Sequence, residues 1–125
     1  ALTGIRIRNT GDQEAAARDL LQFGCAAALV KGGHGEGDEV VDVLATVDGI
    51  ERLVHPRVAT RNTHGTGCTI ASAIAAGLGS GQRMAAAVRR GRRYLQRALE
   101  TATPLGSGHG PVNHLHTVMP FDGED

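Results

Sequence analysis

Hydrophobic residues near the start of the chain recur at the three- and four-residue spacing of an amphipathic helix. Thr10 and Gln13 stand at capping-box spacing before this pattern, which runs through Phe23, and Gly24 follows where a C-cap glycine belongs. Residues 26–30 then form a short continuous apolar run, typical of a strand covered on both faces. A helix, a buried strand and a glycine-rich loop in this order predict an α/β architecture.

The middle of the chain carries the pattern of a β-hairpin. Residues 40–47 and 50–54 are strand-like stretches that flank Asp48-Gly49, a dipeptide typical of two-residue turns. Residues 57–60 predict a further strand-like stretch. It leads into a loop over residues 61–67 that contains two glycines.

Two helices are predicted after this loop. Residues 68–78 are rich in alanine and isoleucine and end at Gly79-Ser80-Gly81, and residues 82–102 form a longer helical pattern. The apolar positions of the longer helix are Met84, Val88, Leu95 and Leu99, and its other face carries Arg89, Arg90, Arg92, Arg93 and Arg97. We interpret these arginines as a solvated face. The tail from Pro104 onward is rich in Gly, Pro and His, which predicts irregular structure.

Composition and charge narrow the range of partners. The 125 residues suit one compact unit, and 13 Lys+Arg balance 13 Asp+Glu, which argues against nucleic acid or an anionic membrane as a partner. No apolar run approaches the ~20 residues of a membrane span. Two cysteines are too few for a disulfide-stapled secreted scaffold and favour the reducing cytoplasm. Cys25, between the first helix and the buried strand, is expected in the core.

The segment Asn62-Thr63-His64-Gly65-Thr66-Gly67-Cys68 offers the clearest chemistry. Its two glycines let the backbone turn sharply just before a helix, whose amides and positive dipole end would then face a phosphate. Cys68 falls in the first helical turn, where its thiolate is favoured and can take a proton from a substrate hydroxyl. The alternative is a plain glycine turn, with Cys68 as a small buried residue.

A second candidate is the segment Lys31-Gly32-Gly33-His34, directly after the predicted buried strand. Lys31 is the only lysine in the chain, and open α/β sheets bind ligands beyond the carboxyl ends of their strands. A lysine between glycines can approach phosphates as a compact charge, although the spacing is not that of a Walker A loop. The alternative is an ordinary turn.

These two segments and the tail Gly108-His109-Gly110-Pro111-Val112-Asn113-His114 together resemble the C-terminal half of hydroxymethylpyrimidine/phosphomethylpyrimidine kinases, of the ribokinase-like superfamily. The resemblance implies a ribokinase-like three-layer α/β fold, of which the chain holds the C-terminal portion. That portion is part of the central sheet with flanking helices and a β-hairpin. Residues 1–125 are then expected to be the nucleotide- and phosphate-binding half of one kinase domain, with the N-terminal half absent.

The resemblance also implies a reaction. Such kinases phosphorylate 4-amino-5-hydroxymethyl-2-methylpyrimidine and then its monophosphate, in thiamine biosynthesis, with ATP and Mg²⁺. Cys68 would stand where many sugar kinases of the superfamily have an aspartate base, and the catalytic set would be Gly65, Thr66, Gly67 and Cys68. Lys31 would contact ATP phosphates, with nucleotide contacts from Lys31, Gly32, Gly33, Thr60 and Thr63, and the stretch 40–54 would help wall the adenine site.

Three alternatives remain at this point. The same glycine-cysteine loop occurs in kinases of pyridoxal or pyridoxine, a non-catalytic nucleotide-binding module would keep the fold, and a thiol nucleophile with His64 as base is less favoured. The chain is expected to be a fragment or one part of a split pair, inactive alone, whose partner is the missing half or another copy. His109, His114 and His116 are read as loop packing, so no metal ligand is predicted.

Overall fold

The computed structural model describes residues 2–33 and 37–118. Within these ranges the chain separates into two compact units, residues 1–57 and residues 58–125, and each is described by itself. His34, the last residue of the lysine-glycine motif, lies outside the described residues. No helix of the described ranges is long and apolar enough to cross a bilayer.

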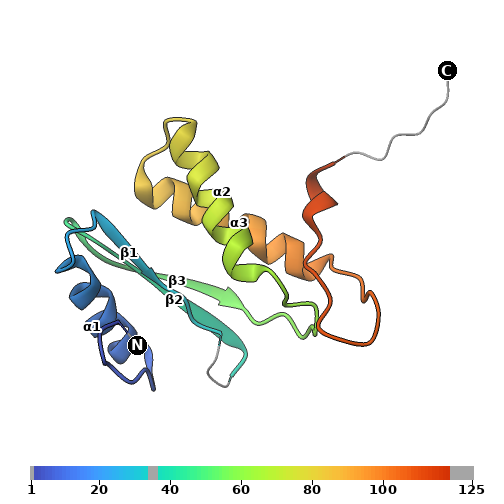
Figure 1. Ribbon diagram of the computed structural model, residues 1–125, viewed down its shortest axis with the longest axis horizontal. Helices are drawn as coiled ribbons and strands as arrows, with labels where there is room; N and C mark the ends of the chain where they lie inside the picture. The colour runs from blue at the N-terminus through green and yellow to red at the C-terminus, as the bar shows by residue number, and fades with distance from the viewer. Residues whose placement is uncertain (1, 34–36, 119–125) are drawn as a thin grey trace. The chain divides into compact units, whose positions relative to one another are not determined.

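The first unit is a three-stranded antiparallel sheet with one helix against it (Figure 1). Its elements are α1 (Thr10–Leu21), β1 (Ala27–Val30), β2 (Glu39–Thr46) and β3 (Gly49–Pro56), and the strand order is β1-β2-β3. Its small core contains Ala17 of α1 with Val43 and Ala45 of β2, all fully buried. β2 is the central strand, and its residues 42–45 are all buried, without the alternation typical of a strand with one face open to solvent.

α1 begins one residue earlier than the capping-box spacing predicts. The N-cap is Asn9, whose side-chain oxygen accepts a hydrogen bond from the Asp12 N–H at 2.9 Å. Gln13 does not complete a capping box, because its side chain is buried and its amide donates to the Val41 carbonyl at 3.0 Å. The C-cap is Gln22 rather than the predicted Gly24, which lies two residues further on with a φ of 88° and donates from its N–H to the Leu21 carbonyl.

β1 confirms the predicted strand, but the expectation that it is covered on both faces is wrong. Only Ala28 is buried, and the other three residues of β1 are half-buried, because β1 is an edge strand that pairs with β2 alone among the described residues. The core placement of Cys25 is also wrong, since its side chain is exposed. Cys25 lies in the link between α1 and β1, where its thiol donates to the Leu20 carbonyl at 3.4 Å.

The predicted hairpin is present, with its turn displaced by one residue. Thr46 pairs with Gly49, so the turn residues are Val47 and Asp48, and Gly49 opens β3 with a φ of 135°. The strand expected over residues 57–60 is absent. β2 begins at Glu39, opposite Pro56, so the chain has no partner strand to pair with beyond that point.

The second unit is a pair of packed helices, α2 (Thr66–Gly79) and α3 (Met84–Glu100), followed by an irregular tail with one 3₁₀ turn, η1 (His114–Thr117) (Figure 1). Both helices are confirmed with shifted ends. The prediction that the arginines of this helix face solvent is wrong for Arg92, which is only 4% exposed. Arg92 follows Val88 by four residues and precedes Leu95 by three, so it falls within the buried stripe of α3.

Candidate active site

The glycine loop forms the entrance to α2. Gly65 is the N-cap, with a φ of 85° in the left-handed region that glycine adopts without strain. Its carbonyl accepts from both the N–H and the hydroxyl of Thr69, at 2.9 and 2.8 Å, which fixes the first turn. Gly65 has no side chain with which to cap the helix, so no side-chain cap covers the first-turn amides, and apart from the Thr66 N–H they are free of a cap that would compete with an anion.

Cys68 lies in this first turn and is exposed, so its interpretation as a small buried residue is wrong. Its side chain lines a groove of about 720 Å³ in the second unit. Along the groove stand further residues of α2, then Arg90 and Tyr94 of α3 and His114 of the tail. A thiol at the positive end of a helix dipole, open to a groove, is placed to exchange a proton with a bound molecule.

The other two loop residues expected to contact nucleotide serve local structure here. Thr60 is half-buried, and its hydroxyl accepts from the Asn62 N–H at 3.1 Å. Thr63 is exposed, and its carbonyl accepts from the Thr66 N–H at 3.5 Å. Both lie in the second unit, within the segment that enters α2.

Lys31 follows β1 directly, at the strand's carboxyl end, as predicted. It is half-buried and lines a depression of about 480 Å³ in the first unit, together with Arg8, Arg57 and the N-terminus of α1 at Asn9 and Thr10. The depression therefore combines three basic side chains and the N-terminal end of α1 with one carboxylate, Glu39, a balance that suits an anionic ligand.

Gly32 and Gly33 hold the lysine loop in a shape that requires glycine. A Cβ at Gly32 would lie 2.2 Å from the Val41 carbonyl oxygen, and Gly33 has a φ of 98°. The Gly32 N–H donates to a carboxylate oxygen of the buried Asp42 at 2.7 Å, and the Arg57 guanidinium donates to the Gly33 carbonyl at 3.0 Å. The sequence interpretation missed Asp42 and Arg57, although a lone Asp inside the apolar stretch of β2 was a usable signal.

One carboxylate beside the depression is held ionised. Hydrogen bonds from the Arg8 guanidinium and from the Arg8 N–H lower the pKa of Asp12 below its ordinary value. Elsewhere in the described ranges, no three His, Cys, Asp or Glu side chains gather as a metal site requires.

Comparison with known proteins shows what the chain resembles. A sequence model of the phosphomethylpyrimidine kinase family matches residues 1–113. The chain is 49% identical, over 115 residues, to the hydroxymethylpyrimidine/phosphomethylpyrimidine kinase of Streptomyces coelicolor. The alignment covers 90% of this chain and 42% of that protein. It is 46% identical, over 114 residues, to the thiamine biosynthesis bifunctional protein ThiED of Geobacter sulfurreducens. That alignment covers 91% of this chain and 23% of the Geobacter protein.

A solved structure shows the same fold. The ADP complex of Bacillus subtilis pyridoxal kinase aligns with a TM-score of 0.86 at 26% identity, over 92% of this chain and 43% of that one. This confirms the predicted ribokinase-like α/β fold. The chain spans less than half the length of each of these three proteins.

Proposed function

Since the chain belongs to the phosphomethylpyrimidine kinase family, we propose that it is the nucleotide- and phosphate-binding portion of a kinase that phosphorylates hydroxymethylpyrimidine and its monophosphate in thiamine biosynthesis. The names of the Streptomyces and Geobacter relatives support this reaction and pathway. Because the chain spans under half of each relative, we assign the rest of the substrate pocket to a complementing portion of the domain. Two free thiols in the described residues support a cytoplasmic location.

The observation that carries the proposal is the exposed Cys68 in the first turn of α2, directly behind Gly65 and Gly67. The amides of Gly65, Thr66, Gly67 and Cys68 stabilise negative charge on the phosphoryl group during transfer. The Cys68 thiolate accepts the proton of the substrate hydroxyl and becomes a thiol, while the substrate oxygen bonds to the γ-phosphorus of ATP and the bond from that phosphorus to the leaving ADP breaks.

ATP fits the charge and backbone that the chain offers. Lys31, held by Gly32 and Gly33, supplies a compact positive charge for nucleotide phosphates. The ADP bound in the Bacillus relative supports a nucleotide at this fold. Mg²⁺ would offset phosphate charge, but the described residues group no three ligands for it. We therefore assign it to the phosphates and water rather than to a cage from this chain.

The test compares two exposed thiols in a complemented kinase, made by joining the N-terminal portion of the Streptomyces relative to this chain. Cys68→Ala should lower kcat for hydroxymethylpyrimidine by about 10²–10⁴, the usual contribution of a general base, with little change in the KM for ATP. Cys25→Ala, which removes the other exposed thiol, should leave both constants unchanged. Equal rates for the two variants would remove Cys68 from the chemistry.

Pyridoxal is the second candidate substrate, because the solved structure that shares the fold at 26% identity is a pyridoxal kinase. The complemented kinase should show a higher kcat/KM for hydroxymethylpyrimidine than for pyridoxal. The reverse order would assign the chain to pyridoxal phosphorylation. ATP binding without turnover of either substrate would favour a non-catalytic nucleotide-binding module.

A further inference from the structure

The tail that follows α3 runs back to the segment that enters α2. The His64 N–H donates to the Gly110 carbonyl at 3.1 Å, and His64 and Pro111 form an isolated parallel bridge. The His109 ring nitrogen Nδ1 lies 3.3 Å from the Arg61 carbonyl, which accepts from it in the tautomer protonated there. These contacts end only one residue before Gly65, the N-cap of α2.

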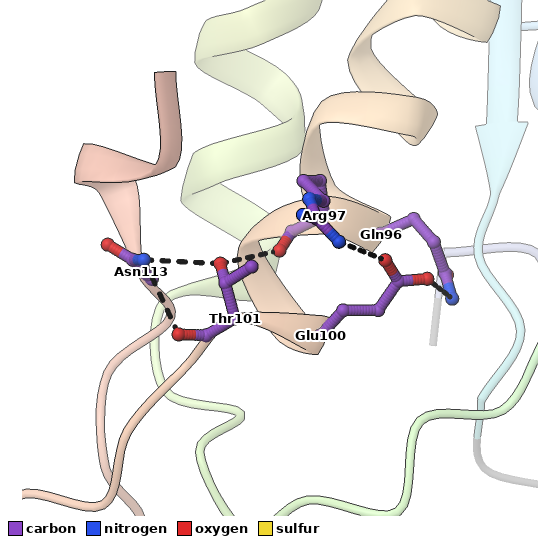
Figure 2. Close-up of polar contacts among 5 residues, drawn as sticks. All are labelled: Gln96, Arg97, Glu100, Thr101 and Asn113. Carbon is purple, nitrogen blue, oxygen red and sulfur yellow. Dashed lines mark hydrogen bonds and ion pairs between the residues drawn. The ribbon is translucent and has the colours of Figure 1, made fainter. Parts of the chain in front are cut away.

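Both segments are also fastened to the C-terminal end of α3, each by one asparagine. Asn62, only 5% exposed, donates from its side-chain amide to the Ala102 carbonyl at 3.3 Å. The Asn113 amide donates to the carbonyl and the hydroxyl of Thr101, at 3.4 and 3.1 Å (Figure 2). The last carbonyls of a helix lack intrahelical donors, so the two asparagines satisfy groups that would otherwise need water.

The end of α3 is itself ordered by a chain of bonds. The Thr101 hydroxyl donates to the Arg97 carbonyl at 2.7 Å, which leaves its oxygen to accept from Asn113. Figure 2 shows the Glu100 carboxylate between Arg97 and Gln96 on the same turn. The Asn113 N–H adds a bond to the carbonyl of the buried Ala98 at 2.9 Å. The attachment point is therefore a fixed helix end.

Gly110 shows how closely the two segments fit. A Cβ at this position would lie 2.2 Å from the side-chain oxygen of Asn62 and 3.0 Å from its Cγ. Asn62 has little room to retreat, because its amide is committed to α3. Gly108, two residues earlier in the same tail, has nothing within 4 Å of such a Cβ.

We propose that Asn62 and Asn113 are positioning residues for phosphoryl transfer, an inference that rests on the function proposed above. Together with Gly110 they form a brace between the end of α3 and the segment that enters α2. The brace sets the direction of the chain three residues before Gly65, and so the aim of the first-turn amides and of Cys68. Sites of this kind must hold their groups within about 0.5 Å, which a free loop does not do.

The test uses one methyl group at two places in the tail of the full chain. In Gly110→Ala the methyl meets Asn62, and in Gly108→Ala it meets open space. We expect the His64 amide to exchange with solvent about tenfold faster in Gly110→Ala, as for one lost hydrogen bond. The amide resonances of Gly65, Gly67 and Cys68 should shift in the same variant, while Gly108→Ala resembles the parent in both respects.

Local loosening must be distinguished from global unfolding. Exchange at Ala73 and Ala87, buried where α2 and α3 pack, should stay at the parent rate in Gly110→Ala. If Gly110→Ala unfolds instead, Thr101→Val is the second variant, because it weakens the attachment of Asn113 by removing the hydroxyl that accepts from Asn113 and donates to the Arg97 carbonyl. If the amide resonances of Gly65–Cys68 stay at their parent positions in Thr101→Val, and also in Gly110→Ala where that variant folds, the proposal of a brace is refuted.

A coupling measurement completes the test. In an Asn62→Ala background the Gly110 methyl has lost its obstacle, so the added substitution should shift the Gly65–Cys68 resonances much less than it does in the parent. Equal shifts in the two backgrounds would refute the proposal. These readouts need no ligand. A titration with inorganic phosphate, followed by the same amide resonances, tests the proposed function separately. If phosphate does not shift these resonances in the parent chain, that result would count against the proposed function but not against the brace.

Discussion

Single buried polar residues hold both glycine loops in place. Asp42, in the middle of an apolar strand, accepts the Gly32 N–H, and Asn62 reaches the end of α3 from the segment that enters α2. Removing either side chain would leave a partly buried backbone group without its partner, the Gly32 N–H in one case and the Ala102 carbonyl in the other. The candidate functional groups, Lys31 and Cys68, are thus placed by residues that do not themselves face a ligand.

At the residue scale, an ion pair on the first unit gives a test by pH. The hydrogen bond from the Arg52 guanidinium lowers the pKa of Glu14, and Glu14 in turn raises the pKa of Arg52. A lowered carboxyl pKa contributes stability above the unfolded-state value and loses it as pH falls through the folded-state value. In Arg52→Gln we expect the Glu14 titration, followed by carboxyl NMR shifts, to move upward.

The control for this pair is Arg6→Gln, which removes one arginine that does not contribute to the Glu14 shift. It should leave the Glu14 titration in place. Because both partners are solvent-accessible, the effect on unfolding should be small and should shrink with added salt. A Glu14 titration that is the same in the parent and in Arg52→Gln would show that the pair does not form in solution.

Residue types predicted burial less well than they predicted chemistry. Free cysteines are buried on average, but Cys25 is exposed, because it lies in the link between α1 and β1 rather than in a helix or strand. Arg92 breaks the rule that charges face solvent, because helical spacing places it in the α3 stripe. Cys68 was identified from its neighbours, since two glycines before a helix define a backbone geometry that the structure reproduces.

At the scale of elements, α2 and α3 meet through glycines. A Cβ at Gly77 would lie 3.1 Å from the Ala87 Cβ and 3.3 Å from its Cα, and one at Gly91 would lie 2.9 Å from an Ile74 side-chain carbon. Small residues at the crossing let the two backbones approach closely. The helix that carries Cys68 is therefore held by its contact with α3 as well as by its own hydrogen bonds.

The prediction at this scale compares two glycines of α2. Gly77→Ala should lower the free energy of unfolding, because its Cβ would meet Ala87 and the Gln82 side chain, and an overpacking cost of about 1–3 kcal/mol offsets or outweighs the roughly 1 kcal/mol that alanine gains over glycine in a helix. Gly79→Ala, with nothing within 4 Å of its Cβ, keeps only the gain and should be neutral or stabilising. Thermal melts followed by circular dichroism measure both, at about 4–8 °C per kcal/mol. A Gly77→Ala variant as stable as Gly79→Ala would contradict the close crossing.

Helical and hairpin periodicity predicted every long element, and apart from the predicted strand over residues 57–60, which is absent, the errors fall at the ends of the elements. The turn of the hairpin is Val47-Asp48 instead of Asp48-Gly49, and the cap of α1 is Asn9 instead of Thr10. Asn9 and Thr10 are both favoured N-cap residues, so the local rule does not separate them, whereas the hairpin turn is set by the register that pairs Thr46 with Gly49. The brace was not predictable, because no local sequence pattern relates the Asn62 side chain to the carbonyl that accepts from it 40 residues further along.

At the scale of the whole molecule, the described residues leave much apolar surface open to solvent. Phe23 is 70% exposed, Leu115 is 70% exposed and Val54 is 50% exposed, and β1 presents an edge with no neighbouring strand. Exposed apolar residues and an unpaired strand edge together favour association with another segment. The relatives that this chain matches are more than twice its length, and their additional sequence is the natural candidate for that segment.

The final prediction follows from this surface. Purified alone, the chain should neither phosphorylate hydroxymethylpyrimidine nor exclude an apolar dye such as anilinonaphthalene sulfonate. Mixed with the separately expressed N-terminal portion of the Streptomyces coelicolor relative, it should form a complex, lose dye fluorescence and release ADP in step with pyrimidine phosphate. Cys68→Ala should bind that portion and suppress the dye signal equally while remaining inactive, which separates assembly from chemistry. Turnover by the chain alone would contradict the split, and failure of the two portions to associate, with the dye signal unchanged, would show that the apolar surface serves another purpose.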